Sequence, residues 1–262
     1  MRNSGVFWGG LLILLGVLFL LNTLGILPAI PWRVLWPAAL ILLGIVVLLN
    51  AFGRRAETAV EALALQLKGF EAAEVEFHYG AGQLRIDSGA APDELLAGSF
   101  GGGVSHQLGE KDSVAHVALS ARPAGFWDWG AWRDRVWDVR LNGDIPLKLT
   151  IDSGAAEVRA DLSATQTRRL AIHTGASSNE ITLPAAAGLT EVSVEGGAGS
   201  VALTVPEGVA ARIEGGVGAG SLNVDTGRFP RAGSAYQSAD YDKAANRAVI
   251  RVTFGAGEVR VR

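Results

Sequence analysis

A short unit of two alternating segments joined by a glycine recurs along the chain, and this recurrence constrains the fold more than any other feature. In the copy at residues 149–162, Leu149 and Ile151 alternate with polar residues before Gly154, and a second alternating segment follows. Alternation with a period of two is typical of β-strands with one buried face. Glycine suits the corner because it lacks a Cβ and readily adopts positive φ. The glycines assigned to the corners are Gly80, Gly154, Gly175, Gly197, Gly216 and Gly255.

The spacing of these glycines, about 20 residues in most cases, indicates stacked repeats. One unit buries few apolar side chains, each contributing about 1.5–3 kcal/mol, whereas ordering the backbone costs about 1–2 kcal/mol per residue. Stacking gives each unit a shared core and a paired backbone. The sequence therefore predicts a mainly β, solenoid-like stack of short strands over residues 56–262. A β-sandwich remains the alternative, since it also has evenly spaced short strands.

Two apolar runs without acidic residues precede the repeats, at about residues 6–27 and 33–52, with Pro28 and Pro31 between them. Each run is long enough to cross a hydrocarbon core of about 30 Å. The sequence thus predicts a transmembrane helical hairpin in an N-terminal domain of residues 1–55. A cleaved signal peptide fits poorly because a second apolar run follows at once. Tryptophan and arginine favour membrane interfaces, and the residues expected there are Trp8, Trp32, Trp36, Arg54 and Arg55.

Charge gives an orientation for the hairpin and bears on the choice of partner. Arg2, Arg54 and Arg55 lie on one side of the bilayer and Arg33 on the other. The positive-inside rule then places both ends of the hairpin, and the β domain, in the cytoplasm. Residues 56–262 carry a net charge of −7, which argues against nucleic acid as a partner because nucleic acid requires a basic patch.

Several motifs resemble a known family. The pattern Trp32-x-x-x-Trp36-Pro37, followed by Leu-Ile-Leu-Leu-Gly, resembles the transmembrane region of bacterial LiaI/LiaF-like proteins. The repeats are similar to toast-rack and LiaF-like C-terminal domains. The resemblance implies a multi-pass protein of the bacterial plasma membrane, and some members of the family tune cell-envelope stress signalling by a sensor kinase. The segments of the β domain that carry the similarity are residues 137–141, 145–147, 151–155 and 252–261.

An unusual tryptophan-rich segment, residues 126–137, interrupts the repeats. Trp137 begins the following strand and is expected in the core. Trp127, Trp129 and Trp132 lie in a loop outside the repeat pattern. They either fold back to cover an end of the stack or form an aromatic patch for the membrane or a partner.

Near the C-terminus the repeat is broken again. We expect an irregular excursion over residues 226–247, and then a last strand pair, residues 248–262, at the exposed end of the stack.

No pattern in the chain points to catalysis. The absence of cysteine excludes disulfides and thiolate chemistry. His78 and His173 share a solvent-facing position, two residues before the corner, with Asp152, Glu195 and Glu214. Such a row could hold a cation, since neighbouring strands lie about 4.8 Å apart, but a solvated face is the more frequent outcome. We expect no catalytic residues, no cofactor and no metal.

The expected function is therefore that of a membrane-anchored, non-catalytic regulatory protein. Its expected partners are the lipid bilayer and another membrane protein such as a sensor kinase. One alternative is a structural or adhesin-like scaffold that forms homo-oligomers through unpaired strand edges. An enzymatic function is the least favoured hypothesis.

Overall fold

The computed structural model describes residues 37, 40–41, 44, 60–122 and 135–262. The chain divides into two compact units, Met1–Ala56 and Glu57–Arg262. The four described residues of the first unit, which include Leu40 and Ile41, are helical. No helix among the described residues is long and apolar enough to cross a membrane. The two predicted membrane helices lie almost entirely outside the described residues, so the hairpin stays a prediction.

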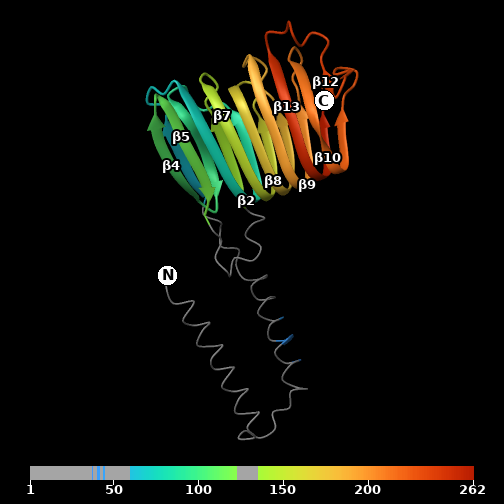
Figure 1. The fold of residues 1–262 in the computed structure, drawn as a ribbon. Helices are drawn as coiled ribbons and strands as arrows, with labels where there is room; N and C mark the ends of the chain where they lie inside the picture. Colours follow the sequence, from blue (N-terminus) through green and yellow to red (C-terminus); the bar gives the residue numbers. More distant parts are fainter. Residues whose placement is uncertain (1–36, 38–39, 42–43, 45–59, 123–134) are drawn as a thin grey trace, which may run out of the picture. The chain divides into compact units, whose positions relative to one another are not determined.

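The described part of the second unit is built from thirteen strands (Figure 1). Six are long, and the other seven are short and lie mainly at the two ends of the array. The long strands are β2 (Ala72–Ser88), β7 (Pro146–Asp161), β8 (Gln166–Thr182), β9 (Leu189–Thr204), β10 (Ala210–Val224) and β13 (Arg247–Val261). The short strands are β1 (Val60–Gln66), β3 (Glu94–Gly101), β4 (Val104–Lys111), β5 (Val114–Ala121), β6 (Val136–Leu141), β11 (Arg231–Ala232) and β12 (Ala235–Gln237).

Each long strand is one copy of the repeat unit. In β7 the alternation of buried and exposed residues changes phase at Gly154 and Ala155, which are both exposed. The halves before and after this point turn their alternate side chains into the same core. We call each long strand a rung, and its two halves the first and second legs.

The rungs stack in parallel and in register. β2 pairs with β7, β7 with β8, and β8 with β9. At the position before the corner, for example, Tyr79 of β2 pairs with Ser153 of β7. The structure therefore contains stacked units with glycine at the corner, as the repeat predicts.

Stacking also supplies the core that a single unit lacks. Leu149 and Ile151 from the first leg of β7 and Val158 from its second leg are almost completely buried. Ile172 of β8 and Val194 of β9 continue the column of Ile151, again without exposed surface. The inward-facing residues at equivalent positions of successive rungs thus stack into continuous apolar columns, as their period-two alternation in the sequence indicates.

At the N-terminal end of the stack the architecture changes. The first leg of β2 pairs with β5 and its second leg with β6. Antiparallel strands extend the sheet beyond each leg of β2. β4 pairs with β5 beyond the first leg, and β3 pairs with β6 and β1 with β3 beyond the second leg. Trp137 of β6 is fully buried, and its ring centroid lies 5.0 Å from that of Tyr79 and 4.9 Å from that of Phe100. The predicted core position of Trp137 is confirmed.

The C-terminal strand does not end the stack, contrary to expectation. β13 lies between β9 and β10 and pairs in parallel with both (Figure 1). Its second-leg residues Val259 and Val261 are fully buried, whereas Leu222 and Val224, their counterparts in β10, are only half-buried. Over its whole length β13 has the bulkier apolar residues, because its Val252 and Phe254 pair with Gly215 and Val217 of β10. The glycine-rich strand takes the edge. Burial of apolar area favours this order.

The excursion that makes this insertion possible covers residues 225–246. It contains the two short strands β11 and β12, and β12 pairs with the first leg of β10 at Arg212 and Ile213. Phe229 is 1% exposed, so this segment contributes to the core at the end of the stack. The guanidinium of Arg228 donates hydrogen bonds to the carbonyl oxygens of Val205 and Pro206.

Candidate functional site

The strand register decides which glycines form the corners. Gly80, Gly154, Gly175, Gly197 and Gly255 occupy equivalent positions in five rungs. The assignment of Gly216 is wrong, because Gly216 pairs with Thr253, two residues before the corner of β13. Between the pairs Val217–Phe254 and Ala219–Ala256, Gly218 is the residue opposite Gly255.

Close approach of neighbouring rungs, and not positive φ, explains the corner glycines. None of the corner glycines has a φ in the left-handed region. A Cβ on Gly255 would lie 2.6 Å from the carbonyl oxygen of Gly197, and one on Gly218 would lie 2.9 Å from that of Gly255. A Cβ on Gly80, in the rung where the column begins, would meet nothing within 4 Å. Each later glycine therefore leaves room for the backbone of the rung before it.

Positive φ occurs two residues later, in a second column of glycines that the repeat analysis did not identify. Gly82, Gly199, Gly220 and Gly257 have φ values between 124° and 155°. The signal was present in the sequence as the tripeptide Gly-Ala-Gly, which starts at four of the corners and includes residues 218–220. This tripeptide would have identified Gly218 as a corner.

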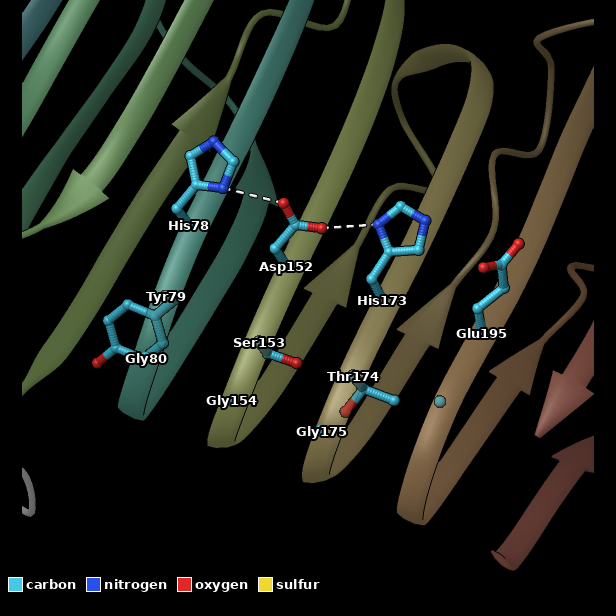
Figure 2. Close-up of a pocket in the computed structure, with 11 residues that line it drawn as sticks. His78, Tyr79, Gly80, Asp152, Ser153, Gly154, His173, Thr174, Gly175 and Glu195 are labelled. Atoms are coloured by element: carbon cyan, nitrogen blue, oxygen red, sulfur yellow. Dashed lines mark hydrogen bonds and ion pairs between the residues drawn. The ribbon is translucent and has the colours of Figure 1, made fainter. Parts of the chain in front are cut away.

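Just before the corners, a shallow groove crosses the outer face of the first legs (Figure 2). Four of its side chains come from adjacent rungs at one register position, two residues before the corner: His78, Asp152, His173 and Glu195. We call this set the histidine row. The next residue of each rung points inward, so Tyr79 and Ser153 are buried beneath it. The predicted Glu214 is not in the row, because it pairs with Arg251.

Asp152 is the centre of the histidine row (Figure 2). One carboxylate oxygen lies 2.9 Å from Nδ1 of His78, and the other lies 2.7 Å from Nδ1 of His173. A carboxylate only accepts hydrogen bonds, so each imidazole donates from Nδ1. The Nε2 atoms are directed away from Asp152, and Glu76 lies 3.5 Å from that of His78. These two contacts orient both imidazoles toward Asp152, although each of the three side chains is exposed by a third or more.

The histidine row presents exposed imidazole and carboxylate groups that can form hydrogen bonds with polar groups of a ligand. Within the described residues, no group of three or more His, Asp or Glu side chains is arranged to hold a metal ion. The hydroxyl of Ser153 is buried and lies 3.2 Å from that of Ser177, so it does not reach the row as a nucleophile. Tyr79 is also unavailable as a base, because its hydroxyl donates to the carbonyl of Arg135 at 2.7 Å and burial raises its pKa to about 12.

A second charged group lies farther from the corner on the same face. Glu74 of β2 accepts from the ammonium of Lys148 on β7, and it lies 3.1 Å from Nδ1 of His116 on β5. The hydrogen bond from Lys148 is the main cause of a lowered pKa of Glu74, and partial burial opposes it. Together with the histidine row, this group makes the first-leg face a surface of cross-strand ion pairs.

Inside the stack, a small polar cluster interrupts the apolar columns. Asn179 is fully buried in the column of Val158 and Val201. Its side-chain amide donates to the hydroxyl of Ser177 at 3.0 Å, and Thr174 also bonds to Ser177. The carbonyl oxygen of the Asn179 side chain has no hydrogen-bond partner among the described residues. This cluster is a structural feature without a counterpart in the other rungs.

The remaining predicted residues cannot be placed. Trp127, Trp129 and Trp132, like the five residues assigned to the membrane interface, lie outside the described residues.

Two family models match the chain. The description "LiaI-LiaF-like transmembrane region" matches residues 6–48, and "N-terminal domain of toast_rack" matches residues 54–204. The first match gives the chain a membrane-anchoring segment of this type. The second covers rungs β2, β7, β8 and β9 and includes the whole histidine row.

Among solved structures, a candidate cell adhesion protein from Clostridium sporogenes matches with a TM-score of 0.70 and 22% identity, over 78% of this chain and 98% of that chain. This similarity shows the fold alone. A candidate adhesin from Bacteroides fragilis covers similar shares, 78% and 97%, with 9% identity and a TM-score of 0.27, too low to support an argument. No curated protein sequence matches the chain. The parallel stack and the matched regions together show that the chain belongs to the toast-rack family and carries a LiaI-LiaF-like transmembrane region.

Proposed function

We propose that the protein is a membrane-anchored, non-catalytic interaction module that modulates cell-envelope stress signalling by contacting another membrane protein. The observation that carries the proposal is the direct succession of the two matched regions. Only residues 49–53 separate the transmembrane region from the toast-rack domain. The toast-rack domain is therefore tethered by its own chain to a membrane-anchoring segment.

The histidine row is the surface we assign to this contact. Its imidazoles are already oriented by Asp152. Binding of a partner therefore costs less side-chain entropy of the two histidines than it would if they were mobile. The parallel ladder beneath also fixes the spacing of the row. A polar, preorganised surface of this kind fits a regulated contact better than a permanent one.

The test uses the full-length protein in its own membranes. After crosslinking and extraction in detergent, we expect the wild type to capture another membrane protein, identified by mass spectrometry. Asp152→Ala, which releases both imidazoles, should capture less of it. Glu180→Ala, a change on the outer face of the second leg, is the matched control and should behave as the wild type.

A cellular readout completes the test. Deletion of the protein should change the output of an envelope-stress reporter, and the wild type should restore it whereas Asp152→Ala should not. The proposal fails if no membrane protein is captured above an unrelated membrane protein used as bait. Equal capture by Asp152→Ala and the wild type would show that the histidine row is not the contact surface.

The side of the membrane is part of the proposal. Three of the four arginines in residues 1–55 flank the ends of the predicted hairpin, which supports a cytoplasmic β domain. A reporter active only in the cytoplasm should therefore be active when fused after Arg262. Activity of a reporter that works only outside the cytoplasm would contradict the orientation.

A second candidate function is a homo-oligomeric scaffold. It is favoured by the exposed outer edge of β10, which has no strand partner along most of its length in the described part of the chain.

A further inference from the structure

The outer edge of β10 is the longest unpaired strand edge in the described residues. β10 pairs with β13 from Ala210 to Val224, but on its other side β12 covers only Arg212 and Ile213. The stretch Glu214–Val224, which we call the β10 edge, therefore presents free backbone donors and acceptors. Its second leg is exposed at Ala219, Gly220, Ser221 and Asn223.

The sequence of the β10 edge lacks the devices that normally prevent pairing. Edge strands are usually protected by lysine, proline, inward charges or bulges. Beyond Glu214, the β10 edge has no charged residue and no proline. The edge strand β4 at the opposite end, in contrast, exposes His106, Glu110 and Lys111.

The core is also incomplete beside this edge. Val217, Leu222, Val224 and Tyr236 are only partly buried, although all four pack against the main core. Another strand beside the second leg of β10 would cover this surface, as β13 covers the equivalent residues of β9.

We propose that the occupant of the β10 edge is the β10 edge of a second copy, paired antiparallel across a two-fold axis. Two observations select a second copy. The edge is neutral from Gly215 to Val224, so identical edges meet without like charges facing each other. At the opposite end the outermost strands, β1 and β4, are short and run antiparallel to their neighbours. They offer no full-length parallel rung on which another copy could stack head to tail, so an isologous contact remains.

Membrane anchoring makes so short a contact sufficient. The second leg of β10 offers about six residues for pairing, and an interface of this size is weak between freely diffusing proteins. The LiaI-LiaF-like region at residues 6–48 places copies in the same bilayer, which raises their effective concentration. This inference rests on the proposed assembly of the anchored protein with membrane partners.

The absence of cysteine from the chain allows a direct test. We expect full-length Ser221→Cys, treated in membranes with a short bismaleimide, to form a covalent dimer. Ser178→Cys is the matched control, because Ser178 occupies the same outward column on β8, away from the edge. It should remain monomeric under the same conditions.

A second pair of variants tests the contact without a crosslinker. Ser221→Lys combined with Asn223→Lys places like charges across the two-fold axis, and it should reduce the dimer several-fold by native mass spectrometry in detergent. Both positions are exposed, and the hydrogen bond from Asn223 to Glu258 that is lost lies on the surface, so the unfolding temperature should change by no more than about 2–4 °C, the shift for about 1 kcal/mol. Ser178→Lys should leave the dimer intact.

Equal crosslinking of Ser221→Cys and Ser178→Cys would overturn the inference, as would a dimer that resists the double lysine variant. Crosslinking of Ser221→Cys to a protein of different mass would show that another chain occupies the edge. Capture of a membrane partner by wild-type protein that contains no dimer would overturn this inference and leave the proposed regulatory function standing.

Discussion

Substituting alanine for Gly255 tests the explanation of the corner glycines and the position of β13 together. In the structure the new Cβ would lie 2.6 Å from the carbonyl oxygen of Gly197. Real Cβ contacts essentially never fall below 3.0 Å, so β13 must move away from β9 by about 0.4 Å at the corner. The clash exists only because β13 is stacked on β9.

The size of the effect follows from the cost of overpacking a well-packed site, which is about 1–3 kcal/mol. For a unit of about 200 residues, each kcal/mol lowers the unfolding temperature by about 2–4 °C. We therefore expect Gly255→Ala to lower the unfolding temperature of the full-length protein by about 4–8 °C, for a loss near 2 kcal/mol. Far-ultraviolet circular dichroism in detergent measures this transition.

Gly80→Ala is the matched control. Gly80 is a corner glycine with ordinary φ, and its Cβ would meet nothing within 4 Å. Removing a glycine from such a position stabilises a protein by about 0.4–1 kcal/mol, because the unfolded chain loses freedom. Gly197→Ala, whose Cβ would lie 3.1 Å from the carbonyl oxygen of Gly175, should fall between the two.

The outcome that refutes this reasoning is a loss of stability in Gly80→Ala equal to that in Gly255→Ala. Glycine would then be required by the corner itself and not by the neighbouring rung. An unchanged unfolding temperature in Gly255→Ala would instead contradict the placement of β13 against β9.

Three further predictions concern the core and the first-leg face. Trp137→Ala should cost about 3–5 kcal/mol by denaturant unfolding, because a fully buried aromatic side chain is removed; a loss below 1 kcal/mol would contradict the aromatic cluster. Asn179→Val should change stability by less than about 1 kcal/mol, because it removes an unsatisfied polar group. Val158→Asn should cost about 1–3 kcal/mol, because it buries such a group. Equal losses of stability in the two variants would be inconsistent with this account. The lowered pKa of Glu74 contributes stability above the unfolded glutamate pKa of about 4.3, and this contribution disappears as pH falls through the lower pKa of the folded state. Lys148→Gln should therefore reduce the loss of stability measured from pH 6 down to pH 3. An unchanged dependence of stability on pH would exclude the Glu74–Lys148 pair as its cause.

Much of the fold could be predicted from the sequence because it depends on local pattern. The alternation of Leu149, Ile151 and Val158 with polar residues predicts an inward face without further information. Stacking is predicted because one unit cannot bury enough apolar surface by itself. The position of Trp137 in the core was predicted for the same reason.

The candidate site was less accessible to sequence reasoning. The sequence placed His78, Asp152, His173 and Glu195 at one repeat position, and the structure brings them side by side. It gave no indication that Asp152 would bind both imidazoles, since this depends on side-chain rotamers in adjacent rungs. The prediction of Glu214 in this row is wrong, because the corner of β10 is Gly218 and not Gly216.

The sequence by itself determined the repeat unit, its inward and outward faces and the apolar segments that precede it, because period and composition are local properties. Only the tertiary structure decided the order of the rungs and the reason for the glycines. β13 pairs with β9 and β10 although neither adjoins it in the chain. That order reflects burial of Val252 and Phe254 of β13 in place of Gly215 and Val217 of β10, a comparison between distant segments that no local pattern contains. Likewise, the clash that excludes a Cβ at Gly255 comes from the carbonyl oxygen of Gly197, on another rung.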